Sequence, residues 1–140
     1  MSERILLTLM DFRLAVLCEK VKFESNSRMT LIGIFRQIRC DSFPYTHPKM
    51  ALGCSILVAD SDRYDHVNIS IDLINPDGKH VAHVLTYEAI LVGGINDHEL
   101  FNFDVDLVDL TFDIPGDYQF SIFVQRILVK TVDLNLCLAT

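Results

Sequence analysis

Strict alternation of apolar and polar side chains is the feature that most constrains what this chain can fold into. Over residues 66–73, valine, isoleucine and leucine occupy every second position, with histidine, asparagine, serine and aspartate between them. Only an extended strand places every second side chain on one face, so this segment predicts a strand with one buried and one hydrated face. The same period of two returns over 100–108, 118–124 and 132–138.

About eight segments of this kind follow one another, and no segment of helical length shows a helical period. The remaining strands are expected over 11–23, 30–40, 52–58 and 79–88. The chain is therefore predicted to be all-β, a two-sheet antiparallel β-sandwich of about eight strands, forming a single domain over residues 1–140. Its core is expected to contain Val67, Ile69, Ile71, Leu73, Phe101, Phe103, Val105, Leu107, Tyr118, Phe120, Ile122 and Val124.

Two short segments have the composition of hairpin turns. In Asn75-Pro76-Asp77-Gly78, proline fixes φ and glycine tolerates positive φ, which favours a β-turn. Gln125-Arg126 lies between two alternating segments and predicts a second hairpin tip. Each turn is expected to join neighbouring antiparallel strands.

Three local irregularities refine this picture. The apolar positions of 11–23 change from even to odd numbers after Cys18, which predicts a β-bulge there. Residues 31–35 are apolar on both faces, as in a central strand. Pro44 and Pro48 flank three residues, and because proline cannot donate to a sheet ladder, 42–48 is predicted to be a loop that crosses between the sheets.

Composition and charge narrow the class of protein. Half of the residues are hydrophobic (50%), so the chain has ample material for a core and is not intrinsically disordered. The formal net charge of -7 argues against non-specific binding to nucleic acid or to an anionic membrane. No segment approaches the roughly 20 apolar residues of a membrane span, and residues 1–11 lack the features of a signal peptide. A cytoplasmic protein is expected.

The four cysteines fit that compartment. Cys18, Cys40, Cys54 and Cys137 include no C-x-x-C pair, so neither a zinc ribbon nor a thioredoxin-like motif is present. A chain with a full core needs no disulfides, and a buried free cysteine behaves as a small hydrophobic residue. Four reduced thiols are expected.

Aspartates supply the strongest candidate metal ligands. Asp60, Asp62 and Asp65 share one polar loop, and Asp104 with Asp106 lies on one face of a predicted strand. Calcium takes several such oxygen ligands, but the glycine and terminal glutamate of an EF-hand are absent. Aspartate is also a preferred turn residue, so a hydrated turn is the favoured interpretation. No cofactor and no strong metal dependence are expected.

No catalytic constellation is evident, and an enzyme is not expected. Ser42 and His47 lack the G-x-S-x-G context of an activated serine and are interpreted as structural. His80 and His83 are three apart on a predicted strand and should face opposite ways, unable to share an ion. Tyr118 follows Pro-Gly-Asp at a strand start and is interpreted as a fold-stabilising tyrosine corner.

The connection over 89–95 is unusually apolar for a loop. Its members Ile90, Leu91, Val92 and Ile95 accompany a pair of glycines. Either the preceding strand continues to Val92 and these residues fill the core, or they form an exposed patch that marks a protein contact, most simply in a homodimer. We expect a non-catalytic interaction or structural module, self-associating or part of an intracellular assembly, that binds neither nucleic acid nor membranes. The alternative is a β-sandwich that binds a small ligand or calcium through the loop 60–65.

Three groups of segments together resemble a family of small, uncharacterised bacterial β-sandwich domains. The resemblance covers most of the chain and implies an all-β fold, without a known activity, cofactor or site. The sequence departs from the family pattern at Gln125-Arg126, where such domains tend to carry a glycine-containing turn. The segments are 12–21 with 31–35, then 42–48, and finally 75–78 with 115–120.

Overall fold

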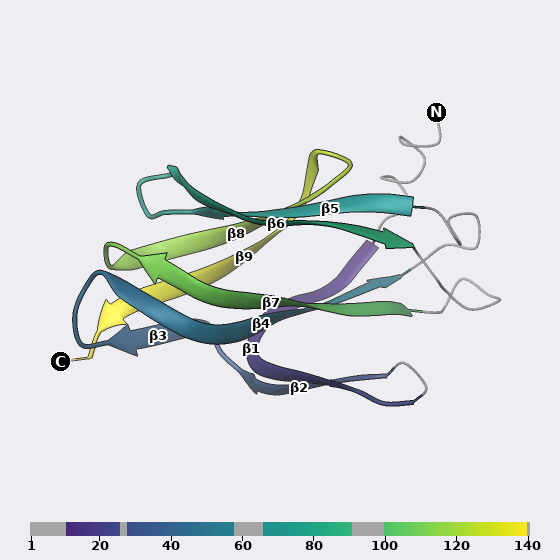
Figure 1. Ribbon diagram of the computed structural model, residues 1–140, viewed down its shortest axis with the longest axis horizontal. Helices are drawn as coiled ribbons and strands as arrows, with labels where there is room; N and C mark the ends of the chain where they lie inside the picture. Colours follow the sequence, from purple (N-terminus) through teal and green to yellow (C-terminus); the bar gives the residue numbers. More distant parts are fainter. Residues whose placement is uncertain (1–10, 26–27, 58–65, 91–99, 140) are drawn as a thin grey trace.

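The computed structural model describes residues 11–25, 28–57, 66–90 and 100–139. They form two sheets packed face to face (Figure 1), which confirms the predicted all-β sandwich, with nine strands in place of about eight. The four-stranded sheet has the order β2-β1-β4-β7 and consists of β1 (Asp11–Phe23), β2 (Met29–Ile34), β4 (Tyr45–Leu57) and β7 (Leu100–Phe112). The five-stranded sheet has the order β3-β9-β8-β5-β6 and consists of β3 (Gln37–Cys40), β5 (His66–Ile74), β6 (His80–Ile90), β8 (Gly116–Val124) and β9 (Ile127–Leu138).

The expectation of purely antiparallel pairing is wrong at one place. β3 runs parallel to β9, with Gln37 opposite Asn135 and Cys40 opposite Leu138. A parallel pair needs a long crossover between its strands, and here five strands intervene. The first and last regions of the chain therefore close one edge of the sandwich together.

The core lies between the two sheets where the alternation predicted it. Every second residue from Val67 to Leu73 and from Tyr118 to Val124 is at most 1% exposed. On β7, Phe103, Val105 and Leu107 are buried, and Phe101 packs against them while partly exposed. The predicted inward faces of β5, β7 and β8 are thus confirmed.

Both predicted hairpin turns are present. The Asn75 side-chain oxygen accepts hydrogen bonds from the amides of Asp77 and Lys79, each at 2.9 Å. Gln125 and Arg126 have φ values of 51° and 69°, the pair of positive angles of a type I′ turn. Two hydrogen bonds hold this glycine-free tip against β5: the Gln125 amide donates to the Asn68 carbonyl at 2.9 Å, and the Asn68 amide donates to Gln125 Oε1 at 2.8 Å.

The bulge in β1 lies earlier than predicted. The register between β1 and β4 shifts between Phe12 and Leu14, so that Ala15 and Leu17 face the core. The shift of the apolar positions from even to odd numbers after Cys18 is not caused by a bulge. It occurs where the pairing of β1 with β4 ends, which is at Cys18. From there β1 pairs with β2 alone and bends out of the plane of the sheet (Figure 1).

The predicted strand over 30–40 is two strands in different sheets. β2 lies at an edge of the four-stranded sheet and β3 at an edge of the other. The prediction of a central strand over 31–35 is wrong, since Ile32 is 37% exposed and Ile34 is 59% exposed. The crossover 34–36 is tied to both sheets: the Phe35 amide donates to the Leu17 carbonyl at 3.1 Å, and the Asn135 amide donates to the Arg36 carbonyl at 2.9 Å.

The predicted crossing loop 42–48 is shorter than expected. Only 41–44 form the turn, and Pro48 lies inside β4, which has β1 and β7 as neighbours. β1 pairs only with Ala51 and later residues of β4, so at Pro48 the strand has a partner on one side alone. Proline is tolerated there because the open side requires no amide donor.

Candidate interaction surface

The β1–β2 hairpin covers the outer face of the four-stranded sheet. Leu31 lies so close to Gly53 of β4 that a Cβ at position 53 would be 2.6 Å from Leu31 Cδ2. On this outer face Cys18, Ala51 and Ser55 are at most 4% exposed, although they lie outside the space between the sheets. The side-chain-free glycine therefore lets the hairpin pack directly on β4.

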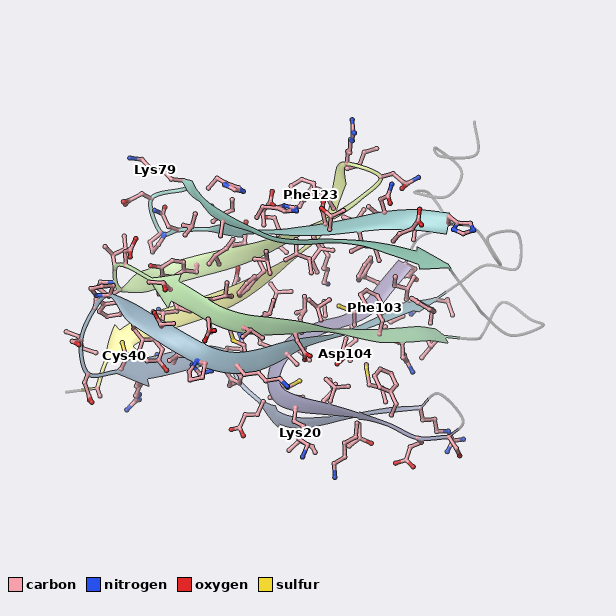
Figure 2. The ribbon with its side chains drawn as sticks, in the orientation of Figure 1. Lys20, Cys40, Lys79, Phe103, Asp104 and Phe123 are labelled. Atoms are coloured by element: carbon pink, nitrogen blue, oxygen red, sulfur yellow. The ribbon has the colours of Figure 1, made fainter. Side chains whose placement is uncertain are left out.

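Asp104 of β7 lies on the side of the sheet nearest the hairpin that carries Lys20 (Figure 2). Its pKa is raised, first by burial and then by the neighbouring Asp106, and Lys49 only partly offsets this. Burial and the Asp104 charge also raise the pKa of the Cys18 thiol, and raise that of Cys54 to about 12. Both thiols are neutral at physiological pH and therefore poor nucleophiles. All four cysteines are free.

Replacing Asp104 with asparagine is expected to raise the melting temperature at pH 7. The folded state holds the Asp104 proton more tightly than the unfolded chain, so this carboxyl favours folding below its unfolded pKa, and the benefit is lost as pH rises through the folded value. At pH 7 the charge is present and unfavourable, and Asp104→Asn removes it. At pH 3 both states are protonated and the gain should vanish. Thermal melts of Asp104→Asn and of Asp41→Asn, an exposed control, test this; equal effects of the two changes would contradict it.

The open side of β2 is an apolar sheet edge. Within the described residues β2 pairs only with β1, so the backbone groups on its other side have no strand partner. The strand Met29–Ile34 contains no charged residue and no proline. Ile32 and Ile34 are exposed on it, and Phe23, opposite Met29 on β1, is 47% exposed.

The other described edge strands carry features that oppose pairing. β3 has only four residues. β7 bears Asp104, Asp106 and Asp109, the last with a φ of 53°. β6 has two register shifts against β5. Short length, charge and bulges are the usual protections of an exposed edge. Of the edges that the structure describes, β2 alone has neither short length, nor charged residues, nor a register shift, although Gly33 within it has a φ of 70°.

The predicted interface residues lie elsewhere. Ile90 is the last residue of β6, the edge of the five-stranded sheet, so the preceding strand extends beyond its expected end at Glu88. Leu91, Val92 and Ile95 lie outside the described residues, as do Asp60, Asp62 and Asp65 of the acidic loop. Their roles stay predictions. Sequence reasoning missed the β2 edge because the apolar run 31–35 is compatible with a central strand as well as with an edge strand.

The prediction that His80 and His83 face opposite ways is wrong. A register shift between them restores a common face, and both rings approach Asp72: His83 Nδ1 is 2.8 Å from Oδ1 and His80 Nε2 is 3.5 Å from Oδ2. His83 Nε2 is also 2.7 Å from the Thr86 hydroxyl. The described part of the chain holds no group of three or more His, Cys, Asp or Glu side chains suited to a metal.

Ser42 and His47 do not share a catalytic arrangement. Ser42 lies in the turn 41–44, whereas His47 lies in β4, where its Nδ1 is 2.8 Å from the Tyr45 hydroxyl. The hydroxyl beside the imidazole is therefore that of tyrosine.

Tyr118 forms the expected tyrosine corner. Its buried ring packs edge-on against Phe112, with centroids 4.9 Å apart. Its hydroxyl donates to the Ile114 carbonyl at 2.7 Å and accepts from the Ile114 amide at 3.2 Å. The strand orders agree with this corner. One sheet contains β1-β4-β7, which matches strands A-B-E of the immunoglobulin fold, and the other contains β9-β8-β5-β6, which matches strands G-F-C-C′. The corner and the strand orders together define an immunoglobulin-like sandwich.

The chain belongs to a family of unknown function (DUF6941), whose sequence profile matches residues 13–136. No curated protein matches the chain. The part of the chain that the structure describes includes no helix with the length and apolar character needed to cross a bilayer.

Three solved structures that resemble the chain have very different sequences. A β-glucosidase from Listeria innocua is 9% identical with a TM-score of 0.50, covering 91% of this chain and 16% of its own. An alkylpurine DNA glycosylase from Pseudomonas fluorescens is 11% identical with a TM-score of 0.48, covering 94% and 32%. An immunoglobulin-like protein from Pseudomonas aeruginosa is 10% identical with a TM-score of 0.40, covering 91% and 95%. The chain thus spans a small part of the first two proteins, and the likeness to the first concerns the fold alone.

Proposed function

We propose that this domain is a non-catalytic interaction module that self-associates by pairing β2 with β2 of a second copy. The observation that carries the proposal is an edge strand with exposed Ile32 and Ile34 and without charge, proline or register shift. Strand addition to an open edge supplies main-chain hydrogen bonds, and the side chains of the edge supply specificity. The four free thiols support a reducing compartment, and we place the module in the cytoplasm.

A second copy of β2 suits this edge. Two identical strands can pair antiparallel about a two-fold axis, and an uncharged strand brings no like charges together when it meets itself. Exposed Phe23 on the neighbouring strand extends the apolar area. A ladder of six residues buries little surface, so the dimer is expected to be reversible and dependent on concentration.

Lysine substitutions on the two edges of one sheet test the proposal. Ile32→Lys with Ile34→Lys places charge on β2; Leu100→Lys with Val108→Lys, at residues 45% and 55% exposed, does the same on β7. In sedimentation equilibrium the parent and the β7 variant should dimerise with rising concentration, and the β2 variant should stay monomeric with an unchanged melting temperature. A parent that is monomeric at millimolar concentration, or equal loss of dimer in both variants, would refute the proposal.

The predicted contact through Ile90, Leu91, Val92 and Ile95 is the competing interface. Ile90 ends an edge strand, so a contact there is compatible with the fold. The variant Leu91→Glu with Ile95→Glu separates the two interfaces. Dimer loss in this variant, with the β2 lysine variant still dimeric, would assign the contact to the segment 89–95.

A further inference from the structure

A second feature arises where β1 leaves the sheet. Beyond Cys18 and Ala51, the first part of β4 pairs only with β7, while β3 belongs to the other sheet. The space between these strands is a hollow of about 650 Å³. Pockets that hold small molecules usually enclose about 300–1,000 Å³, so this hollow has a suitable size. Gly33 and Ile34 at the end of β2 contribute to its lining, and its remaining lining residues lie outside β2.

The hollow has an apolar side and a charged side. Ile34, Phe35 and Ile38 line it from the crossover and β3, and Tyr45, His47 and Pro48 line it from β4. The remaining lining residues are polar or glycine: Glu19, Gly33, Gln37, Arg39 and Lys49. Two cations and one carboxylate therefore lie at the hollow, in a chain whose overall charge is -7.

His47 is held at the centre of an aromatic group. Its ring centroid is 5.8 Å from that of Tyr45 and 6.4 Å from that of Phe35, within the usual range for aromatic pairs. The Tyr45 hydroxyl fixes the ring through Nδ1 at 2.8 Å. Burial lowers the pKa of His47, with a smaller opposing effect from the Lys49 backbone, so the ring is neutral at physiological pH. The group offers flat, uncharged surfaces beside the two cations.

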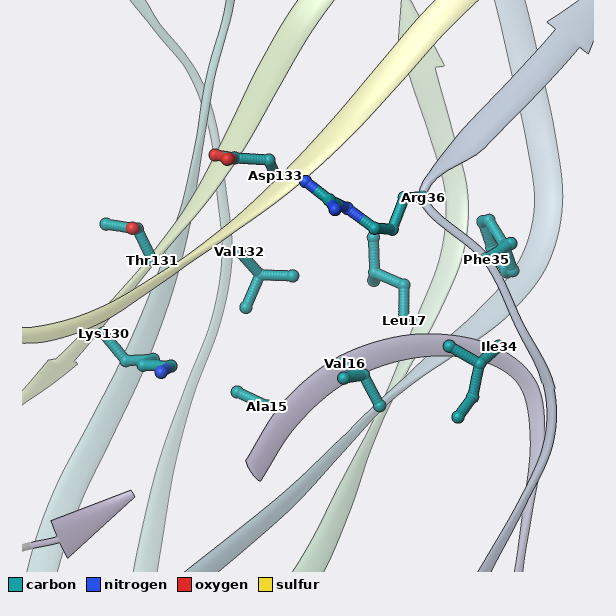
Figure 3. A pocket seen from close by; sticks show the side chains of 10 residues that line it. All are labelled: Ala15, Val16, Leu17, Ile34, Phe35, Arg36, Lys130, Thr131, Val132 and Asp133. Carbon is teal, nitrogen blue, oxygen red and sulfur yellow. The ribbon is translucent and has the colours of Figure 1, made fainter. Parts of the chain in front are cut away.

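The crossover separates this hollow from a smaller one of about 260 Å³. Figure 3 shows the smaller hollow, with Lys130 and Asp133 on β9 and Arg36 extending from the crossover toward Asp133. Its walls include Ala15 and Val132 but only one aromatic residue, Phe35, which both hollows share. The smaller hollow therefore provides a lysine without the aromatic group.

We propose that the larger hollow binds a small aromatic carboxylate, with its ring against Phe35, Tyr45 and His47 and its carboxylate toward Arg39 and Lys49. Aromatic stacking orients the flat part of such a ligand, and a charge-assisted hydrogen bond fixes the acid group. Arg39 has its Nε 3.4 Å from Gln37 Oε1, and none of the carboxylates in the described ranges forms an ion pair with it. Glu19 on the same rim disfavours a ligand with two acid groups.

The test uses 2-naphthoate as the probe and 2-naphthalenemethanol as its uncharged counterpart. Binding of each compound is measured in dilute protein from the NMR chemical shifts of backbone amides and of the His47 imidazole. 2-Naphthoate should shift resonances of 37–39 and 45–49 and bind at least about tenfold more tightly than the alcohol, the equivalent of one charge-assisted hydrogen bond. Arg39→Gln with Lys49→Gln should remove that difference. Lys130→Gln, in the smaller hollow, should leave it intact.

Three outcomes would overturn the proposal. One is the absence of saturable shifts at these residues up to millimolar 2-naphthoate. The second is equal binding of acid and alcohol. The third is an equal loss of acid binding in the Lys130→Gln protein. Thermal melts of each variant confirm that the fold is retained, since Arg39 and Lys49 are exposed. Retained alcohol binding in the Arg39→Gln and Lys49→Gln protein would show directly that its hollow is intact.

Discussion

Replacing Phe120 with alanine is expected to lower the free energy of unfolding by about 3–5 kcal/mol. Phe120 is 0% exposed and lies on β8, between β5 and β9, opposite Leu73 and Val132. The truncation removes the transfer free energy of a whole ring and leaves a cavity that two paired strands cannot collapse into. Denaturant unfolding followed by circular dichroism measures the change.

Phe123 on the same strand is the matched control. Its side chain is only partly buried and belongs to no part of the central core (Figure 2). Phe123→Ala should therefore lower stability by a small fraction of the Phe120→Ala effect. A Phe120→Ala protein with an unchanged unfolding midpoint, or equal losses in the two variants, would show that the facing of β8 is wrong.

Gly116→Ala is expected to destabilise the protein by about 2–5 kcal/mol, the combination of backbone strain and overpacking. Gly116 has a φ of 129°, which residues with a side chain rarely adopt. A Cβ there would also lie 2.7 Å from Pro76 Cγ and 2.9 Å from Pro76 Cβ, and a proline ring cannot rotate aside. The residue begins β8, so the distortion would reach the tyrosine corner two residues later.

Gly78→Ala separates the two causes. Gly78 has a φ of 80°, but a Cβ there would meet no atom within 4 Å. This change introduces backbone strain without a clash, about 1–2 kcal/mol. The difference between the two variants in urea denaturation measures the contact with Pro76. Equal losses would contradict the predicted clash.

The regular part of the fold could be predicted because alternation is a local property. The segments 66–73 and 118–124 each carry an uninterrupted period of two, and their inward faces follow from it. Tyr118 could be assigned to a corner because the Pro-Gly-Asp sequence before it marks a strand start. In each case the deciding information lies within a few residues.

The errors occur where the deciding partner is distant in sequence. Ile34 is exposed because β1 stops pairing with β4 at Cys18. The sequence near Ile34 contains no signal for that distant event. The facing of His80 and His83 depends on a register shift against β5. Pro48 is tolerated in β4 only because β1 has already departed. The open edge of β2 and the hollow beside it both result from that departure and were therefore missed.

Amide hydrogen exchange as a function of protein concentration tests the central claim most directly. If β2 pairs with β2 of a second copy, amides within 29–34 gain protection as concentration rises through the dimerisation range, since strand pairing shields them from exchange. Amides of the charged edge strand β7 serve as the internal reference and should not change. Protection of β2 that is independent of concentration, or a gain confined to β6 or β7, would contradict self-association through this edge.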